Sequence, residues 1–143
     1  NPRNAPVLNY YGYLLADRGV RLEEAVALIK RALAEDPTNA AYLDSIGWAY
    51  YRQNKLAEAE SNIRKAAAQE LHDPTIFTHL GDVLVKSGRP DQAATAREKS
   101  LAEWHRVPPA EFEADKVAEL EQKISSLKNR LAKQKTPGDS GTP

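Results

Sequence analysis

The segment Leu43–Ala59, LDSIGWAYYRQNKLAEA, predicts a helix, a break and the start of a second helix. Gly47 lies in the middle of the first helix, where glycine costs about 1 kcal/mol relative to alanine. Gly12 lies 35 residues before Gly47, and Gly81 lies 34 residues after it. Self-similarity at this period indicates a repeat protein built from helical hairpins.

Apolar residues recur three and four positions apart around each of these glycines, which is helical periodicity and not strand alternation. The three stripes are Leu8, Tyr11 and Leu15; Leu43, Ile46 and Tyr50; and Phe77, Leu80 and Leu84. A break follows each stripe, and glycine at residues 19 and 88 suits the end of a helix. We therefore expect three hairpins within residues 1–106, at about 5–39, 40–73 and 74–106.

The second hairpin resembles the tetratricopeptide repeat in its sequence Leu43-x-x-Ile46-Gly47-x-x-Tyr50, followed by Ala59-x-x-x-Ile63 and Ala66. The resemblance implies an all-α fold, a right-handed α-solenoid of three helix-turn-helix repeats. The third repeat departs from the pattern with Arg97 and Ser100, where apolar or small residues are expected. Asn1-Pro2 mirrors Asp36-Pro37, so we interpret Asn1 as the end of an earlier repeat. We interpret the chain as a fragment of a bacterial-type adaptor or scaffold protein.

The three glycines have a predicted structural role in helix packing. Two helices that pack closely need a small residue where their backbones cross, because a larger one would separate the axes beyond roughly 8–10 Å. The expected contact pairs are Gly12 with Ala25, Gly47 with Ala59, and Gly81 with Ala93.

Residues 107–135 predict one long amphipathic helix after the third hairpin. Its narrow apolar seam consists of Val117, Leu120, Ile124, Leu127 and Leu131, at alternating steps of three and four. The helix either covers the open face of the third repeat, as solenoids require, or pairs with another chain as a coiled coil. Both interpretations stay open at this stage, and residues 136–143 are expected to be disordered because they are small, polar and rich in proline and glycine.

The composition argues against several classes of protein. The formal net charge is 0 and the chain contains no cysteine, so nucleic-acid binding and thiolate metal sites are not predicted. No apolar run approaches the roughly 18 residues of a membrane span. His72, His79 and His105 show no metal-ligand spacing, and no catalytic motif occurs, so we expect no enzyme activity, no metal and no cofactor.

The resemblance implies that the first helix of each hairpin lines a concave groove, and the glycines fix which of its residues face that groove. Aromatic side chains with a polar tip in such a position act as interface anchors, and Trp48 is the expected anchor. For Trp48 and Tyr51, packing against the neighbouring repeat is the alternative role. The predicted groove residues are Asn9, Tyr13, Asp44, Trp48, Tyr51, Arg52, Asp82 and Lys86.

These features predict a non-catalytic scaffold for protein–protein interaction that binds a protein or peptide segment in its groove. The basic residues with which some family members clamp chaperone tails are missing from the groove positions, so that ligand is not expected. One alternative is a structural segment that forms homo-oligomers through the long helix or through an exposed N-terminal edge around Val7, Leu8 and Tyr11. Another is a regulatory scaffold within a larger envelope protein. The compartment stays open, and the resemblance favours the periplasmic side of a bacterial cell envelope over the cytoplasm.

Overall fold

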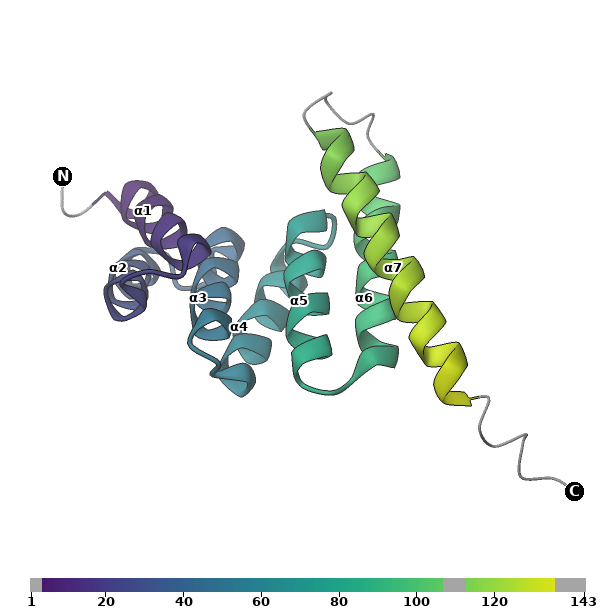
Figure 1. Ribbon diagram of the computed structural model, residues 1–143. Coiled ribbons are helices and arrows are strands. Elements are labelled where there is room, and N and C mark those ends of the chain that lie inside the picture. The colour runs from purple at the N-terminus through teal and green to yellow at the C-terminus, as the bar shows by residue number, and fades with distance from the viewer. Residues whose placement is uncertain (1–3, 107–112, 136–143) are drawn as a thin grey trace, which may run out of the picture.

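The computed structural model describes residues 4–106 and 113–135, which form seven helices and no strand. Six helices form three hairpins: α1 (Ala5–Arg18) with α2 (Leu22–Glu35), α3 (Ala40–Arg52) with α4 (Leu56–Gln69), and α5 (Pro74–Lys86) with α6 (Pro90–Arg106). The hairpins follow one another along the molecule in chain order, and α7 (Ala114–Lys135) lies across the last of them (Figure 1). The predicted all-α, right-handed solenoid is confirmed.

Each hairpin begins with the same capping chemistry. The side chains of Asn4, Asn39 and Asp73 accept hydrogen bonds from backbone N–H groups of the helix that follows, at 3.2, 3.1 and 2.9 Å. An Asn or Asp at this position satisfies a donor that the helix itself cannot pair. The three caps recur at the period of the glycines, so local sequence sets where every hairpin starts.

The turn inside each hairpin depends on a residue with positive φ. Gly19, Asn54 and Gly88 occupy the same repeat position and have φ of 72°, 63° and 77°. Glycine and asparagine adopt this left-handed conformation more easily than other residues. The first turn also contains Arg21 at φ 50°, which accommodates the one additional residue of the first repeat.

Close backbone crossing explains the mid-helix glycines. A methyl group on Gly12 would lie 2.6 Å from Ile29 Cγ1 and 3.0 Å from the carbonyl oxygen of Ala25. On Gly47 it would lie 2.5 Å from Ile63 Cγ1 and 3.1 Å from the oxygen of Ala59. Neither site has room for a methyl group without movement of its neighbours.

The third hairpin differs at this crossing because Arg97 stands where the other repeats have isoleucine. The nearest atoms to a methyl group on Gly81 belong to Arg97, whose Cγ would be 2.8 Å away, and not to the expected Ala93. The arginine stem thus packs against Gly81, while Nη2 donates to Asp82 Oδ1 at 3.0 Å. The departure from the repeat pattern keeps the packing and adds a charged head group.

Ser100, the second departure from the repeat pattern, connects α6 to the start of α5 by hydrogen bonds. Its hydroxyl is fully buried and donates to the carbonyl oxygen of Pro74 at 2.7 Å, and Thr78 Oγ1 lies 2.7 Å from Ser100 Oγ. A buried hydroxyl is stable in this position because both of its hydrogen-bonding roles are satisfied.

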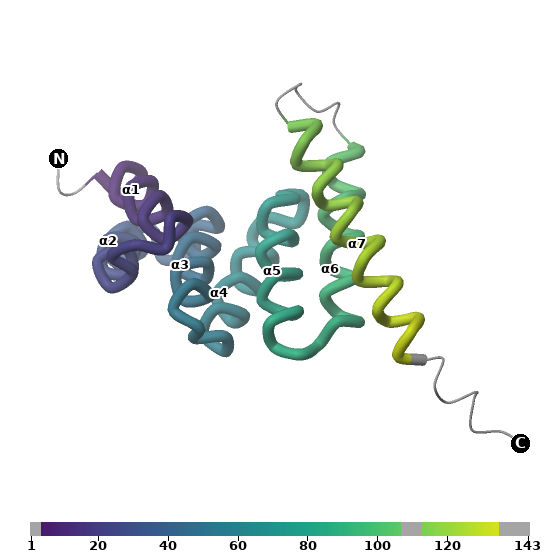
Figure 2. The backbone as a smooth tube through the Cα atoms, in the orientation of Figure 1, coloured from purple at the N-terminus to yellow at the C-terminus, as the bar shows by residue number. Residues whose placement is uncertain are grey.

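The apolar seam of α7 packs against α6 of the same chain. Leu120, Ile124 and Leu127 are buried, and Lys128 Nζ lies 2.6 Å from Glu98 Oε1 on α6. The helix runs diagonally over α6 (Figure 2), so it covers the end of the solenoid. Residues 107–112, the expected start of this segment, and the predicted tail 136–143 lie outside the described residues.

Candidate functional site: the concave groove

The first helices of the three hairpins line one side of a groove, and α6 and α7 line the other side. A cavity of about 400 Å³ lies between them. Tyr13 and Asp17 of α1, Trp48 of α3, and His79 and Asp82 of α5 line one side. The other side is formed by Trp104 of α6 and by Lys116, Glu119 and Lys123 of α7. Residues from five helices therefore converge on this cavity.

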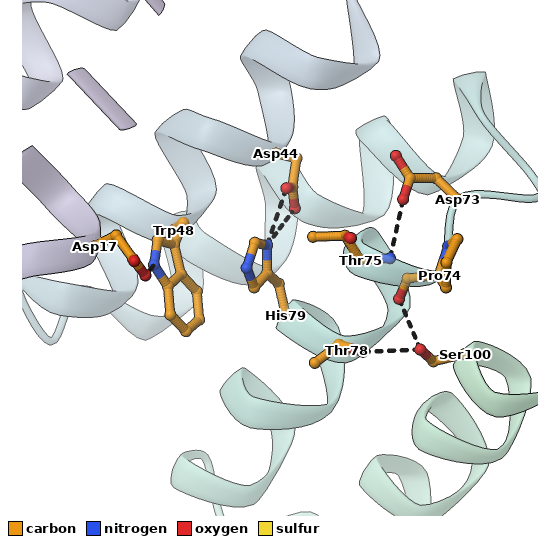
Figure 3. Close-up of polar contacts among 9 residues, drawn as sticks. All are labelled: Asp17, Asp44, Trp48, Asp73, Pro74, Thr75, Thr78, His79 and Ser100. Carbon is orange, nitrogen blue, oxygen red and sulfur yellow. Dashed lines mark hydrogen bonds and ion pairs between the residues drawn. The ribbon is translucent and has the colours of Figure 1, made fainter. Parts of the chain in front are cut away.

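Trp48 is the centre of an aromatic stack in the groove. Its ring centroid lies 4.7 Å from that of Tyr51 and 4.1 Å from that of His79, and both pairs are stacked. The indole N–H donates to Asp17 Oδ1 at 3.3 Å (Figure 3). Only 8% of Trp48 is exposed, so it forms the floor of the groove and packs between repeats, and it does not project from the surface as an anchor would.

The Asp44–His79 pair connects the second repeat to the third. His79 Nδ1 donates to Asp44 at 3.0 Å for Oδ1 and 2.9 Å for Oδ2, and both residues are buried (Figure 3). Burial lowers the pKa of His79, but the charge and hydrogen bond of Asp44 outweigh it, so the pKa is raised. The pair is therefore a buried, titratable contact in the groove floor.

Tyr13 is affected by the same carboxylates. Burial, reinforced by the negative charges of Asp17 and Asp44, raises the pKa of Tyr13 to about 12. At neutral pH the phenol is protonated, as it is in an ordinary tyrosine, and can donate a hydrogen bond to a ligand in the cavity.

Of the remaining predicted groove residues only Asp82 lines the cavity, and each has different neighbours. Asn9 is half-buried, and its Oδ1 is buried without a hydrogen-bond partner among the described residues. Asp82 is paired with Arg97, and Lys86 Nζ lies 5.0 Å from the ring centroid of Tyr51. Arg52 is exposed, with its guanidinium group beside Gly19.

The structure also brings residues into the groove that were not among the predicted site residues. His79 occupies the repeat position of Tyr10 and Ser45, so comparison of the repeats alone does not mark it as a groove residue. Lys116 and Lys123 lie seven residues apart on α7, and that spacing was the available signal that both face one way. Which way they face depends on how α7 is oriented over α6.

The described residues contain neither a cluster suited to a metal ion nor a helix suited to a membrane span. Residues 4–106 and 113–135 contain no group of three or more His, Asp or Glu side chains placed to hold a metal ion. Within the same ranges no helix is both long enough and apolar enough to cross a membrane.

A right-handed stack of helical hairpins with a concave groove defines the class of helical repeat scaffolds. Residues 45–114 match the tetratricopeptide repeat family. A TPR repeat-containing protein of Pseudomonas aeruginosa is 48% identical over 81 residues, which are 57% of this chain and 14% of the relative. This stretch of the chain therefore belongs to the tetratricopeptide repeat family, and the chain spans a small part of that relative's length.

Solved structures with similar folds include protein complexes. The Yersinia enterocolitica type III secretion chaperone SycD, in complex with a peptide of the translocator YopD, has a TM-score of 0.74 at 11% identity, with 87% of this chain and 92% of that chain covered. PcrH, in complex with the chaperone-binding region of PopD, has a TM-score of 0.75 at 15% identity, with 87% and 91% covered. At these identities the likeness shows a shared fold.

Proposed function

We propose that this chain is a non-catalytic scaffold that binds a segment of a partner polypeptide in its concave groove. The observation that carries the proposal is the cavity of about 400 Å³ in which aromatic side chains meet hydrogen-bonding and charged groups. Ligand sites commonly combine a mainly apolar or aromatic lining with a few placed polar groups. A cavity of this size accommodates individual side chains of a docked segment.

The aromatic floor supports this function because contacts within the chain hold its central ring in place. Trp48 is held by Tyr51, His79 and Asp17, so a partner does not have to immobilise it on binding. Preorganised side chains reduce the entropy that association costs. Two structures of similar fold also contain a bound segment of another protein, according to their descriptions.

Selection of peptides from a phage-displayed random library tests this function directly. We expect the immobilised chain to enrich particular sequences, and their affinity to fall at least tenfold with Asp17→Arg, which reverses an exposed charge of the cavity lining, or with Arg52→Glu, which reverses an exposed charge one helical turn after Trp48. Lys30→Glu, an exposed position on α2 away from the cavity, is the matched control and is expected to leave binding unchanged. Enriched peptides that bind all three variants equally would exclude the groove as the binding surface.

A second surface favours contact with another helix. Val7, Tyr10 and Tyr11 are 56%, 63% and 42% exposed on α1, whereas Tyr42 and Ile46, which occupy the repeat positions of Val7 and Tyr11, are 7% and 3% exposed. In the second repeat these positions are covered by the first hairpin. We therefore keep assembly through the N-terminal edge as a second proposal, which light scattering at increasing protein concentration tests with Tyr10→Glu as the comparison.

A further inference from the structure

Three basic residues recur at heptad spacing along α7: Lys116, Lys123 and Arg130. Seven residues are about two helical turns, so successive members are roughly 10 Å apart along one face of the helix. Lys116 and Lys123 line the groove cavity described above. Lys123 and Arg130 line a second cavity of about 490 Å³, and the two cavities share Glu119 and Lys123. Together they form a trough between α7 and the hairpins.

Arg97 of α6 provides an independent observation in the second cavity. Its side chain is only 9% exposed, and Nη2 donates to Asp82 at 3.0 Å. Its Nε is buried and has no hydrogen-bond partner among the described residues. A buried donor without an acceptor is destabilising, and more so when the group is charged. Nε lies beside Gly81 at the helix crossing, so a ligand oxygen pairs with it only if the Arg97 side chain shifts into the cavity that it lines.

The charged side chains that line the second cavity also favour an anionic ligand. Three cationic side chains, Arg97, Lys123 and Arg130, line it together with one carboxylate, Glu119. Glu119 Oε1 lies 3.5 Å from Lys123 Nζ and Asp82 is paired with Arg97, so the excess positive charge of this cavity comes from Arg130. The excess is local, because the chain as a whole carries no net charge.

We propose that the trough between α7 and the hairpins binds an acidic polypeptide segment, whose carboxylates pair with Lys116, Lys123 and Arg130. This inference rests on the proposed function and specifies the chemistry of the partner. A segment in the polyproline II conformation rises about 9 Å per turn of three residues and so carries every third side chain on one face, which is close to the spacing of the basic residues on α7. A segment with Glu or Asp at every third position therefore presents a carboxylate to each of the three.

The inference makes α7 part of the recognition surface as well as the cover of the last hairpin. Its apolar seam packs on α6, while the basic face lies along the trough. Charged partners gain specificity and association rate from such complementary potentials.

Fluorescence anisotropy with three labelled peptides of equal length tests the inference: one with Glu at every third position, one with Lys there, and one with Ser there. We expect the Glu peptide to bind at least tenfold more tightly than the other two. Lys123→Glu with Arg130→Glu is expected to abolish this preference. The matched control, Lys30→Glu with Lys65→Glu, makes the same change in net charge on exposed positions of α2 and α4 outside the trough and is expected to retain the preference.

A neutralised variant, Lys123→Gln with Arg130→Gln, covers the case in which charge reversal unfolds α7, and circular dichroism checks the fold of each variant. Affinity for the Glu peptide should also fall as salt is raised, because exposed charges are screened. Equal binding of the Glu and Lys peptides, or retention of the preference in the folded neutralised variant, would overturn the inference.

These results separate the inference from the function on which it rests. If the Ser or Lys peptide, or library peptides without acidic residues, bind and are lost with Asp17→Arg, the groove function stands and the acidic partner is wrong. If a single-stranded DNA oligonucleotide binds and the Glu peptide does not, the trough recognises another polyanion and the inference is likewise wrong. If no peptide of any charge binds, both proposals fail.

Discussion

Trp48 and His79 stack face to face across the boundary between the second and third repeats, with ring centroids 4.1 Å apart and ring planes 20° from parallel. Trp48 belongs to α3 and His79 to α5, so the contact joins two hairpins. The same imidazole donates to Asp44, and the indole donates to Asp17 of the first repeat. Three successive repeats are thus connected through one cluster in the groove floor.

Replacement of Trp48 by alanine should lower the free energy of unfolding by about 3–5 kcal/mol, because it removes two ring contacts and leaves a cavity. Urea denaturation followed by circular dichroism measures the change. Tyr10→Ala removes a side chain that is 63% exposed and should change stability by about 0.5 kcal/mol or less. Equal effects of the two substitutions would show that the stack contributes little to stability.

The mid-helix glycines should respond differently to alanine. Alanine improves helix propensity by about 1 kcal/mol, but overpacking typically costs about 1–3 kcal/mol. At Gly47 the added methyl meets Ile63 and the backbone oxygen of Ala59, so we expect net destabilisation. At Gly81 it meets the stem of Arg97, which is more flexible than a buried isoleucine, so the cost should be smaller.

Thermal denaturation of Gly12→Ala, Gly47→Ala and Gly81→Ala compares the three sites. Gly12 has the same kind of neighbours as Gly47, with Ile29 and the backbone of Ala25, so these two variants should lose stability to a similar degree. A Gly81 variant less stable than both would contradict the assignment of the packing contacts.

The repeat architecture was predictable because it is encoded by local and periodic signals. The glycine at each crossing, the capping residue before each hairpin and the apolar stripes recur at one period in the sequence. The seam of α7 was likewise visible, and its buried residues are those of the predicted seam. Periodicity gives the face that a helix buries, but it does not give the angle at which that helix crosses its neighbour.

The composition of the groove was less predictable, because it depends on how the helices cross and not only on which face each helix buries. Trp48 lies on the expected face, but its rings are covered by Tyr51 and His79, and a single helical face cannot reveal what covers it. The Asp44–His79 bond joins residues 35 positions apart, at repeat positions where the other hairpins carry different side chains. The basic face of α7 joins the site only because α7 turns that face toward the hairpins.

Leu127→Ala tests how α7 is held. Leu127 is 1% exposed in the contact with α6 and Leu131 is half-buried, so Leu127→Ala should lower the unfolding free energy by about 2–5 kcal/mol and Leu131→Ala by less. Light scattering should give the same molar mass for the parent chain and for both variants, because the seam packs within one chain. A dimer that dissociates with Leu127→Ala would favour the coiled-coil alternative.

The buried Asp44–His79 pair should make stability depend on pH. The pKa of His79 in the folded chain is raised above its ordinary value of 6.5, with burial opposed by the charge and hydrogen bond of Asp44. A raised pKa means that the folded state binds the proton more tightly than the unfolded state. The stabilisation is therefore complete below about pH 6.5 and is lost as the pH rises through the folded pKa. Asp17 and Asp82 act in the same direction.

Melting temperatures across about pH 5 to 9, compared with those of His79→Asn, isolate this contribution. Asparagine keeps an N–H donor for Asp44 but does not titrate, so the advantage of the parent chain over the variant should be greatest at acidic pH and should shrink as the pH rises. Asp44→Asn should lower the pKa of His79 in an NMR titration of the imidazole, because it removes the dominant favourable charge. An advantage that instead grows with rising pH, or an imidazole pKa unchanged by Asp44→Asn, would show that the carboxylate does not stabilise the protonated ring.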